Sequence, residues 1–336
     1  MGEYIVQSGS LALFEIWYII SFFFSTGNLW LLCKKLTVSG TLYPFKSPSF
    51  PIFLVTLYIS GISIIGAGKL VKDLSTSDIM KIITLTTDFG ISDWYVACMK
   101  AVILSINPQV NIIDITHQVP DQDILSASLV LKNCDYFPSG TIHVAVVDPG
   151  VGSSRRGIVV ELSNSQIYVC PDNGLLSFLM QKHRIIRAHV IENLNFCRQP
   201  ISSTFHGRDI FAPVAAHISL GTALGQFGQE TFTVQSLEVS SPQITPTCIQ
   251  GKIIYIDKFG NLISNISQDH LTGKILKAVI NSIEIFKFIN TYSDIAVGEA
   301  GILFSSEGFL EISVNQGSAQ KYLSASLYSS LDLFIS

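Results

Sequence analysis

The stretch that most constrains the fold runs from Thr141 to Gly157 and reads TIHVAVVDPGVGSSRRG. Residues 142–147 are apolar or β-branched apart from His143, which is typical of a strand buried on both faces of a sheet. Asp148 ends this run, and a glycine turn follows it. Because open α/β sheets place their chemistry at the carboxyl ends of their strands, Asp148 is a candidate functional residue.

The turn after Asp148 has two interpretations. Gly150 and Gly152 let the backbone approach a ligand closely, and Arg155 is near enough in the chain to fold back onto the Asp148 carboxylate. An Asp-Pro-Gly turn is also common in proteins, so Asp148 could simply cap it. A dinucleotide-binding fingerprint is excluded, because Arg155 stands where the third glycine is needed.

The composition of the chain says more about which partners it can bind than about which reaction it catalyses. Its 336 residues suffice for two domains and a sizeable core. The net charge of −4 gives no electrostatic footprint for nucleic acid, so no nucleic-acid partner is expected. The six cysteines include no CxxC pair, which favours neither a zinc site nor a disulfide framework.

Residues 1–79 form an apolar extension that differs from the rest of the chain. Residues 11–33 are long enough for a membrane span, and residues 51–68 are borderline. One interpretation is that the extension comes from a mis-set start or is dispensable, with Met80 as the natural start. A second is a single anchor at residues 11–33, which would leave the rest of the chain cytoplasmic. Two spans would instead place residues 69–336 outside the cell. In each case residues 80–336 are expected to fold alone.

From residue 80 onwards, strand patterns alternate with helix patterns. Strands are expected at 82–87, 110–115, 142–147, 157–162 and 167–170, and helices at 94–106, 123–132, 175–181 and 210–220. The alternation predicts an α/β N-terminal domain over residues 80–240, with a mostly parallel sheet and helices on both faces. After a linker near residues 240–246, short strands at regular spacing predict a smaller all-β, barrel-like C-terminal domain over residues 247–336.

Two further clusters in the α/β part could carry chemistry. Asp88 and Asp93 follow the first strand, where a carboxylate can accept both hydroxyls of a ribose or hold a cation; helix capping is the structural alternative. His206 lies directly before an apolar helix, within the motif TFHGRD. His206 is the best candidate for a side chain that changes protonation near neutral pH.

The clusters in the β part are weaker signals. In the motif DKFGN, Phe259 could stack on a base and Asn261 could bind its edge, although a plain hairpin turn explains the motif equally well. Ser306 and Glu307 lie in another turn of this kind. Asp and His at strand ends leave a metal-dependent nucleotide hydrolase open as an alternative, but no HExxH or HxH pattern supports a metal site.

Seven motifs occur together between about residues 80 and 320: TLTTDFG, NIIDITHQVP, HVAVVDPGVGSSRR, VCPDNGLLS, STFHGRDIFAPVAA, IDKFGNLISNI and SSEGFLEISVNQG. In this order they resemble the adenosine-forming S-adenosyl-L-methionine (SAM) hydrolases, also called SAM hydroxide adenosyltransferases, which are relatives of the fluorinase and chlorinase. The resemblance implies hydrolysis of SAM to adenosine and L-methionine, with SAM as substrate and without cofactor or metal. It also implies a homotrimer with its sites at subunit interfaces.

The resemblance further implies which residues act. Asp148, Arg155 and His206 match the catalytic set of the hydrolase branch, whereas the halogenases have Tyr for the Asp and lack the His. The residues implied to bind substrate are Asp88 at the ribose diol, Asp93 and Asp257 at the methionine end, Phe259 and Asn261 at the adenine, and Ser306 and Glu307 at the methionine carboxylate.

Three positions depart from the halogenase pattern. Glu307 stands where the halogenases have Arg, so a methionine carboxylate would be held by backbone N–H groups or by the Ser306 hydroxyl. Gly207 and Tyr95 each stand where the fluorinase has Ser. Together with Asp148, Arg155 and His206, Gly207 makes water rather than halide the expected nucleophile.

The chemistry of such a reaction is in-line attack of water on ribose C5′, with a neutral thioether as leaving group. Positioning the water supplies much of the rate. A positive Arg155 favours hydroxide character, His206 could accept the proton, and Asp148 would orient either of them. A SAM- or adenosine-binding sensor with little turnover is the alternative from another functional class.

Overall fold

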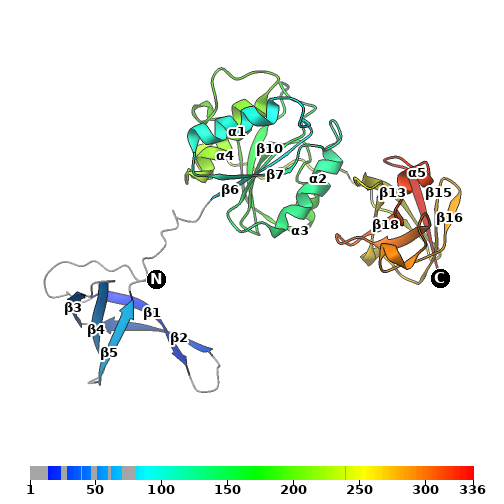
Figure 1. Ribbon diagram of the computed structural model, residues 1–336. Helices are drawn as coiled ribbons and strands as arrows, with labels where there is room; N and C mark the ends of the chain where they lie inside the picture. Colours follow the sequence, from blue (N-terminus) through cyan, green and yellow to red (C-terminus); the bar gives the residue numbers. More distant parts are fainter. Residues whose placement is uncertain are drawn as a thin grey trace. The chain divides into compact units, whose positions relative to one another are not determined.

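The computed structural model describes residues 14–23, 29–38, 40–46, 51–59, 62–69, 81–238 and 240–336. The chain divides into two compact units, Met1–Ile79 and Met80–Ser336. In the first unit, β1 (Phe14–Phe23) pairs with β2 (Leu29–Val38), and β3 (Gly40–Lys46), β4 (Pro51–Ile59) and β5 (Ile62–Lys69) form a three-stranded sheet (Figure 1).

The expected membrane anchor at residues 11–33 is not a helix where the structure describes it. Within the described ranges, no helix combines the length and the apolar character that a membrane crossing requires. The run instead contributes β1 and the first half of β2, while residues 11–13 and 24–28 lie outside the described residues. Its isoleucine and aromatic residues are strong strand formers, which accounts for the difference from a helical prediction.

The α/β domain contains a mixed six-stranded sheet in the order β11-β9-β10-β8-β6-β7. Its parallel strands are β6 (Ile82–Thr87), β7 (Asn111–Thr116), β8 (Ile142–Val146) and β10 (Ile167–Pro171). Two antiparallel strands, β9 (Gly157–Leu162) and β11 (Ile185–Val190), extend one side. The mostly parallel sheet that the sequence predicts is thereby confirmed.

Helices cover both faces of this sheet (Figure 1). One face carries α1 (Tyr95–Ile106) and α4 (Ala212–Ser219), and the other carries α2 (Ile124–Lys132) and α3 (Ser177–Lys182). Along β8, Val144 packs in one core cluster with Met99 of α1, whereas Ala145 packs in the opposite cluster with Leu131 of α2. Because β8 is buried on both sides, polar side chains can reach solvent only beyond its ends.

The C-terminal domain is a nearly closed antiparallel sheet in the order β16-β15-β19-β13-β14-β18-β17, with β12 paired to β13. The strands are β12 (Gln243–Ile244), β13 (Cys248–Ile256), β14 (Leu262–Ser267), β15 (Ile275–Ile280), β16 (Ile283–Ile285), β17 (Ala300–Phe304), β18 (Phe309–Val314) and β19 (Ser330–Ile335). A bridge between Phe288 and Ile302 brings the two edges together. This confirms the predicted barrel-like domain.

Short helical turns connect these elements: η2 (Asn133–Tyr136), η3 (Leu194–Phe196), η4 (Gly207–Phe211), η5 (Leu224–Gln226), η6 (Gln268–His270), η7 (Tyr292–Asp294) and α5 (Ala319–Tyr322). The helix expected from residue 210 thus begins earlier, as the π-helical turn η4, and continues as α4. Strands β11, β12 and β19 were not predicted.

Candidate active site

Asp148 and Arg155 form a two-point ion pair at the carboxyl end of β8. Arg155 Nε donates to Asp148 Oδ1 at 3.0 Å, and Arg155 Nη2 donates to Oδ2. Both side chains are almost fully buried, with 9% of the Arg155 side chain and 5% of the Asp148 side chain exposed. The Asp148 carboxylate therefore binds the Arg155 guanidinium and does not serve only to cap the Asp-Pro-Gly turn. The separation of seven residues had allowed this contact.

His206 joins this pair from the start of η4. Its Nδ1 lies 3.1 Å from Arg155 Nη2. Because a guanidinium can only donate, Nδ1 must accept, and the neutral ring then carries its proton on Nε2. The three residues of the predicted catalytic set are thus brought together by the loops after β8 and before α4.

The environment of His206 favours its neutral form. Burial lowers its pKa below the ordinary 6.5, and the positive charge of Arg155 lowers it further. The negative charges of Asp148 and Asp209 act in the opposite direction without reversing the shift. A neutral imidazole at neutral pH is what the contact from Arg155 requires.

Arg155 itself is nearly saturated by protein acceptors. A third nitrogen, Nη1, donates to the Arg156 carbonyl at 3.2 Å. Within the described residues, the contacts to Asp148, His206 and Arg156 use four of its five N–H donors. One N–H on Nη1 is left for a water molecule or a substrate.

Asp88 follows β6, the strand next to β8. Its Oδ2 accepts from the Gln122 backbone N–H at 2.9 Å. Burial raises the pKa of Asp88, and the negative charges of Asp121 and Asp148 raise it further. Asp88 and Asp148 therefore share one edge of the sheet, where the sequence places both.

Asp93 lies in the loop between β6 and α1 and is exposed. It does not cap the helix, since the N-cap position of α1 is Trp94, which makes no capping hydrogen bond. Next to it, Tyr95 packs edge-on against Phe205, with ring centroids 5.2 Å apart. The loop that carries Asp93 thus leads to Tyr95, whose ring packs against Phe205, the residue before His206.

The second group of predicted residues lies in the turn between β13 and β14. Asp257 Oδ1 accepts from the backbone N–H groups of Phe259 at 2.9 Å and Asn261 at 2.8 Å, and Asp257 Oδ2 accepts from Asn261 Nδ2 at 2.8 Å. Phe259 itself is 74% exposed. In this chain Asp257 and Asn261 build the turn, and the Phe259 ring projects from it.

Ser306 and Glu307 lie in the turn between β17 and β18. Ser306 Oγ donates to Glu307 Oε1 at 2.5 Å, and the Glu307 carbonyl accepts from Lys132 Nζ at 3.4 Å. Both side chains are exposed. Among the described residues, no hydrogen bond or ion pair joins the predicted residues of these two turns to those at the sheet edge.

Sequence patterns did not indicate Glu311 or Tyr292 as functional residues, and Asp209 entered only as part of the TFHGRD motif before the apolar helix. Glu311 of β18 is buried and accepts from Tyr292 Oη at 3.0 Å. Burial raises the pKa of Glu311. Burial and the negative charge of Glu311 together raise the pKa of Tyr292 to about 12. Asp209 of η4 is fully buried three residues after His206. The sequence around Glu311 and around Asp209 shows no pattern that would indicate that these two acids are buried.

No group of three or more acidic, histidine or cysteine side chains in the described ranges is arranged to hold a metal ion.

The family comparisons match both domains. A model of the SAM hydroxide adenosyltransferase N-terminal domain matches residues 83–228, and a model of the C-terminal domain of the same family matches residues 251–331. The predicted catalytic residues lie in the first range, and the two turns of the β domain lie in the second.

Individual relatives agree with these models. The (R)-S-adenosyl-L-methionine hydrolase of Methanocaldococcus jannaschii is 37% identical over 270 residues, covering 76% of this chain and 97% of the relative. A fluorinase of Actinoplanes sp. is 25% identical, covering 70% and 91%. The crystal structure of an uncharacterized conserved protein from Thermotoga maritima superposes with a TM-score of 0.71 at 35% identity, covering 75% of this chain and 99% of that one. The chain belongs to the SAM hydroxide adenosyltransferase family.

Proposed function

We propose that this protein hydrolyses S-adenosyl-L-methionine to adenosine and L-methionine by attack of water or hydroxide on ribose C5′. The observation that carries the proposal is the contact chain from Asp148 through Arg155 to His206, in a chain 37% identical to a named SAM hydrolase. We assign Asp148, Arg155 and His206 to catalysis and Asp88 to the ribose diol.

The leaving group makes little demand on the protein. The sulfonium of SAM departs as a neutral thioether, so no general acid is required. The difficulty lies in the nucleophile, because water must be held about 3 Å from C5′ and opposite to sulfur. The remaining N–H of Arg155 Nη1 can bind that water, and the guanidinium charge favours its hydroxide form.

The geometry gives His206 a specific part in this scheme. With Nδ1 accepting from Arg155, Nε2–H is the group that the ring can present to a water oxygen. His206 therefore orients the nucleophile as a donor in this arrangement, and it accepts a proton only after Arg155 releases Nδ1. Asp148 holds Arg155 in place and balances its charge.

We propose further that the protein is a homotrimer whose site is completed between subunits. Among the described residues no hydrogen bond or ion pair joins the turns around Asp257 and Glu307 to the residues at the sheet edge, which supports a site completed by the turns of another copy. We also propose that the reaction needs no metal or other cofactor. Sedimentation with and without substrate tests the homotrimer, and chelator treatment tests whether the reaction needs a metal.

The function is tested by incubating purified Met80–Ser336 and the full chain with SAM in water enriched in oxygen-18, with and without chloride. The expected products are methionine without label and adenosine with one labelled oxygen, which places the attack at C5′. Halogenated nucleoside would contradict the choice of nucleophile. Unchanged SAM bound to folded protein would instead favour the sensor.

A further inference from the structure

Asp209 is a fully buried carboxylate that the proposed chemistry does not use. Its Oδ1 accepts from Arg208 Nε at 2.7 Å and from Arg198 Nη1 at 3.3 Å. Its Oδ2 accepts from Arg208 Nη2 at 2.8 Å and from the Ser202 backbone N–H at 2.9 Å. Burial alone would raise the pKa of Asp209, but these contacts, led by Arg208, lower it below its ordinary value. Asp209 is therefore an anion at neutral pH.

The backbone of Asp209 closes the loop that its side chain supports. The Asp209 carbonyl accepts from the Arg198 N–H at 2.8 Å, and the Asp209 N–H donates to the Phe205 carbonyl at 3.1 Å. The loop of residues 198–205 thus begins and ends on Asp209, with Ser202 fixed in its middle. His206 follows directly after this loop.

The same loop also packs against the turn that carries Arg155. Gly152 has φ +77°, and a side chain there would run into the Ser203 carbonyl oxygen. Asp209 fixes the loop through Ser202, and Gly152 contacts it at the next residue.

We propose that Asp209 is a positioning residue for His206, which holds the loop of residues 198–205 and thereby sets the imidazole against Arg155. Within the described residues, the Asp209 side chain makes no hydrogen bond or ion pair with Arg155 or Asp148, and its burial keeps it from substrate. The activity measurements below rest on the proposed SAM hydrolysis, whereas the chemical measurement does not.

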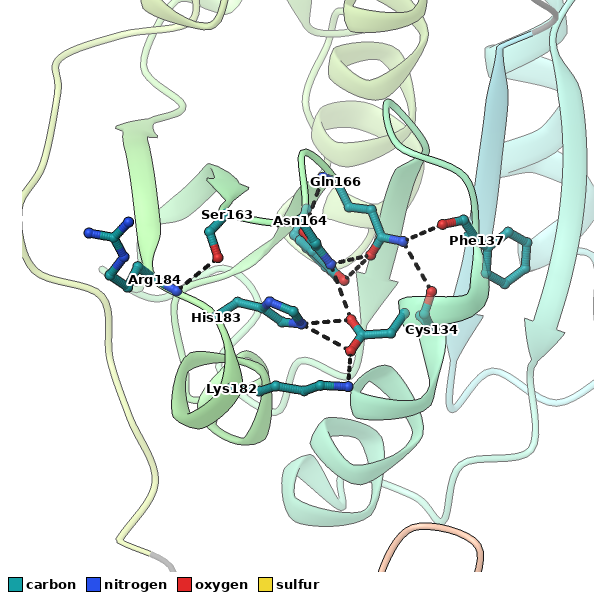
Figure 2. A network of polar contacts seen from close by, with 10 residues as sticks. Cys134, Phe137, Ser163, Asn164, Gln166, Lys182, His183 and Arg184 are labelled. Atoms are coloured by element: carbon teal, nitrogen blue, oxygen red, sulfur yellow. Dashed lines mark hydrogen bonds and ion pairs between the residues drawn. The ribbon is translucent and has the colours of Figure 1, made fainter. Parts of the chain in front are cut away.

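A variant of Asp135 is the matched control that distinguishes a positioning role of Asp209 from a merely structural one. Asp135 is another ion-paired acid of the α/β domain, bound by Lys182, by His183 Nε2 at 2.9 Å and by Asn164 Nδ2 at 3.1 Å (Figure 2). Its network lies near the amino ends of β8 and β10, whereas Asp148 follows the carboxyl end of β8. Loss of either acid weakens the domain, but only loss of Asp209 frees the loop before His206.

The test compares wild type, Asp209→Asn and Asp135→Asn as full chains, at a temperature where circular dichroism shows all three folded. In Asp209→Asn the new amide would turn a donor either towards the Ser202 N–H and Arg208 Nη2 or towards Arg208 Nε and Arg198 Nη1, so two contacts are lost in either orientation. This variant is expected to lower kcat about 10- to 100-fold while KM stays within about twofold, since a 1 Å displacement of a catalytic group is costly. Asp135→Asn is expected to change neither constant.

A second measurement follows His206 without using turnover. Diethylpyrocarbonate modifies neutral imidazole, and mass spectrometry of the peptide containing His206 gives its rate at pH 8. The rate is expected to rise several-fold in Asp209→Asn and to stay at the wild-type value in Asp135→Asn.

The proposal is overturned if folded Asp209→Asn keeps the wild-type kcat and the wild-type modification rate, if Asp135→Asn loses as much kcat, or if only KM changes. A wild-type protein that forms no adenosine from SAM would refute the proposed function. The modification rates would still decide whether Asp209 positions His206.

Discussion

Arg155 binds both oxygens of Asp148 with two different nitrogens, and one of these nitrogens, Nη2, also lies 3.1 Å from His206 Nδ1. The guanidinium plane is thereby fixed by the carboxylate, and it fixes the imidazole in turn. A point charge at the same place could not satisfy this geometry, because lysine lacks the planar fork.

We therefore expect Arg155→Lys to fold and to lose about 100-fold in kcat, because the contact to His206 and the alignment of the nucleophile are lost while a positive charge remains. Steady-state kinetics with SAM measure this. The matched control is Arg156→Lys, since the Arg156 side chain binds Asp172 instead of Asp148. It should lower the free energy of unfolding and leave kcat within about twofold; an equal loss in both variants would contradict the assignment.

The pH dependence of kcat/KM follows from the lowered pKa of His206. Only the neutral ring can accept the N–H of Arg155, so the active form persists below pH 6.5 and is lost as pH falls through the lowered pKa. The acid limb of the profile should therefore have its midpoint below 6.5. His206→Gln should abolish this limb together with most of the turnover. A midpoint at or above 6.5 in the wild type would show that another group controls the limb.

The contact between Gly152 and Ser203 makes its own prediction. Gly152→Ala meets two costs, the positive φ of +77° and the collision with the Ser203 carbonyl. Gly221→Ala meets only the first, since at φ +93° no described atom lies within 4 Å of the new carbon. Gly221→Ala should cost about 1–2 kcal/mol of unfolding free energy and leave kcat unchanged.

Gly152→Ala should cost more and should also lower kcat at least tenfold, because the loop before His206 is pushed away from Arg155. Urea unfolding and steady-state kinetics of the two variants measure the difference. Equal kcat values would mean that the close approach at Gly152 does not govern the site.

The sheet edge of the site could be predicted from local patterns alone. The run before Asp88 is a strand over the expected residues 82–87, and the strand before Asp148 ends one residue earlier than expected, at Val146. These parallel neighbours bring their carboxyl ends together. The contact between Arg155 and Asp148 could be expected because the two residues are only seven positions apart in the chain. These features depend on residues that are close in sequence, which is why the sequence suffices.

Other parts depend on partners that are distant in the chain. Strand β11 contains Arg187 and His189, which break the apolar pattern, and it is held as an antiparallel strand by β9. Strand β19 reads SLDLFI, so polar and apolar residues alternate only over its first four positions. The buried state of Asp209 depends on Arg198 and Ser202. No local pattern reveals such tertiary pairings.

His143 illustrates this limit and leads to a stability prediction. It is the second residue of β8 and is fully buried, with Nδ1 2.7 Å from Thr84 Oγ1 of β6 and its ring stacked on Tyr168 of β10. Burial lowers the pKa of His143 from 6.5 to about 4. The folded state therefore binds fewer protons than the unfolded state between these two values, and stability falls as pH falls.

The stabilisation from neutral His143 is complete above pH 6.5 and is lost progressively down to pH 4, with a total of about 3 kcal/mol. Acids with lowered pKa values, such as Asp135 and Asp209, lose their contributions only below about pH 4. Urea unfolding at pH 7.5, 6.0 and 5.0 measures the slope. His143→Gln keeps a polar group beside Thr84 but cannot titrate, so its slope should be flatter by His143's share. Identical slopes would show that His143 is not the group that makes the fold acid-sensitive, leaving His206 and His217, whose pKa values burial also lowers.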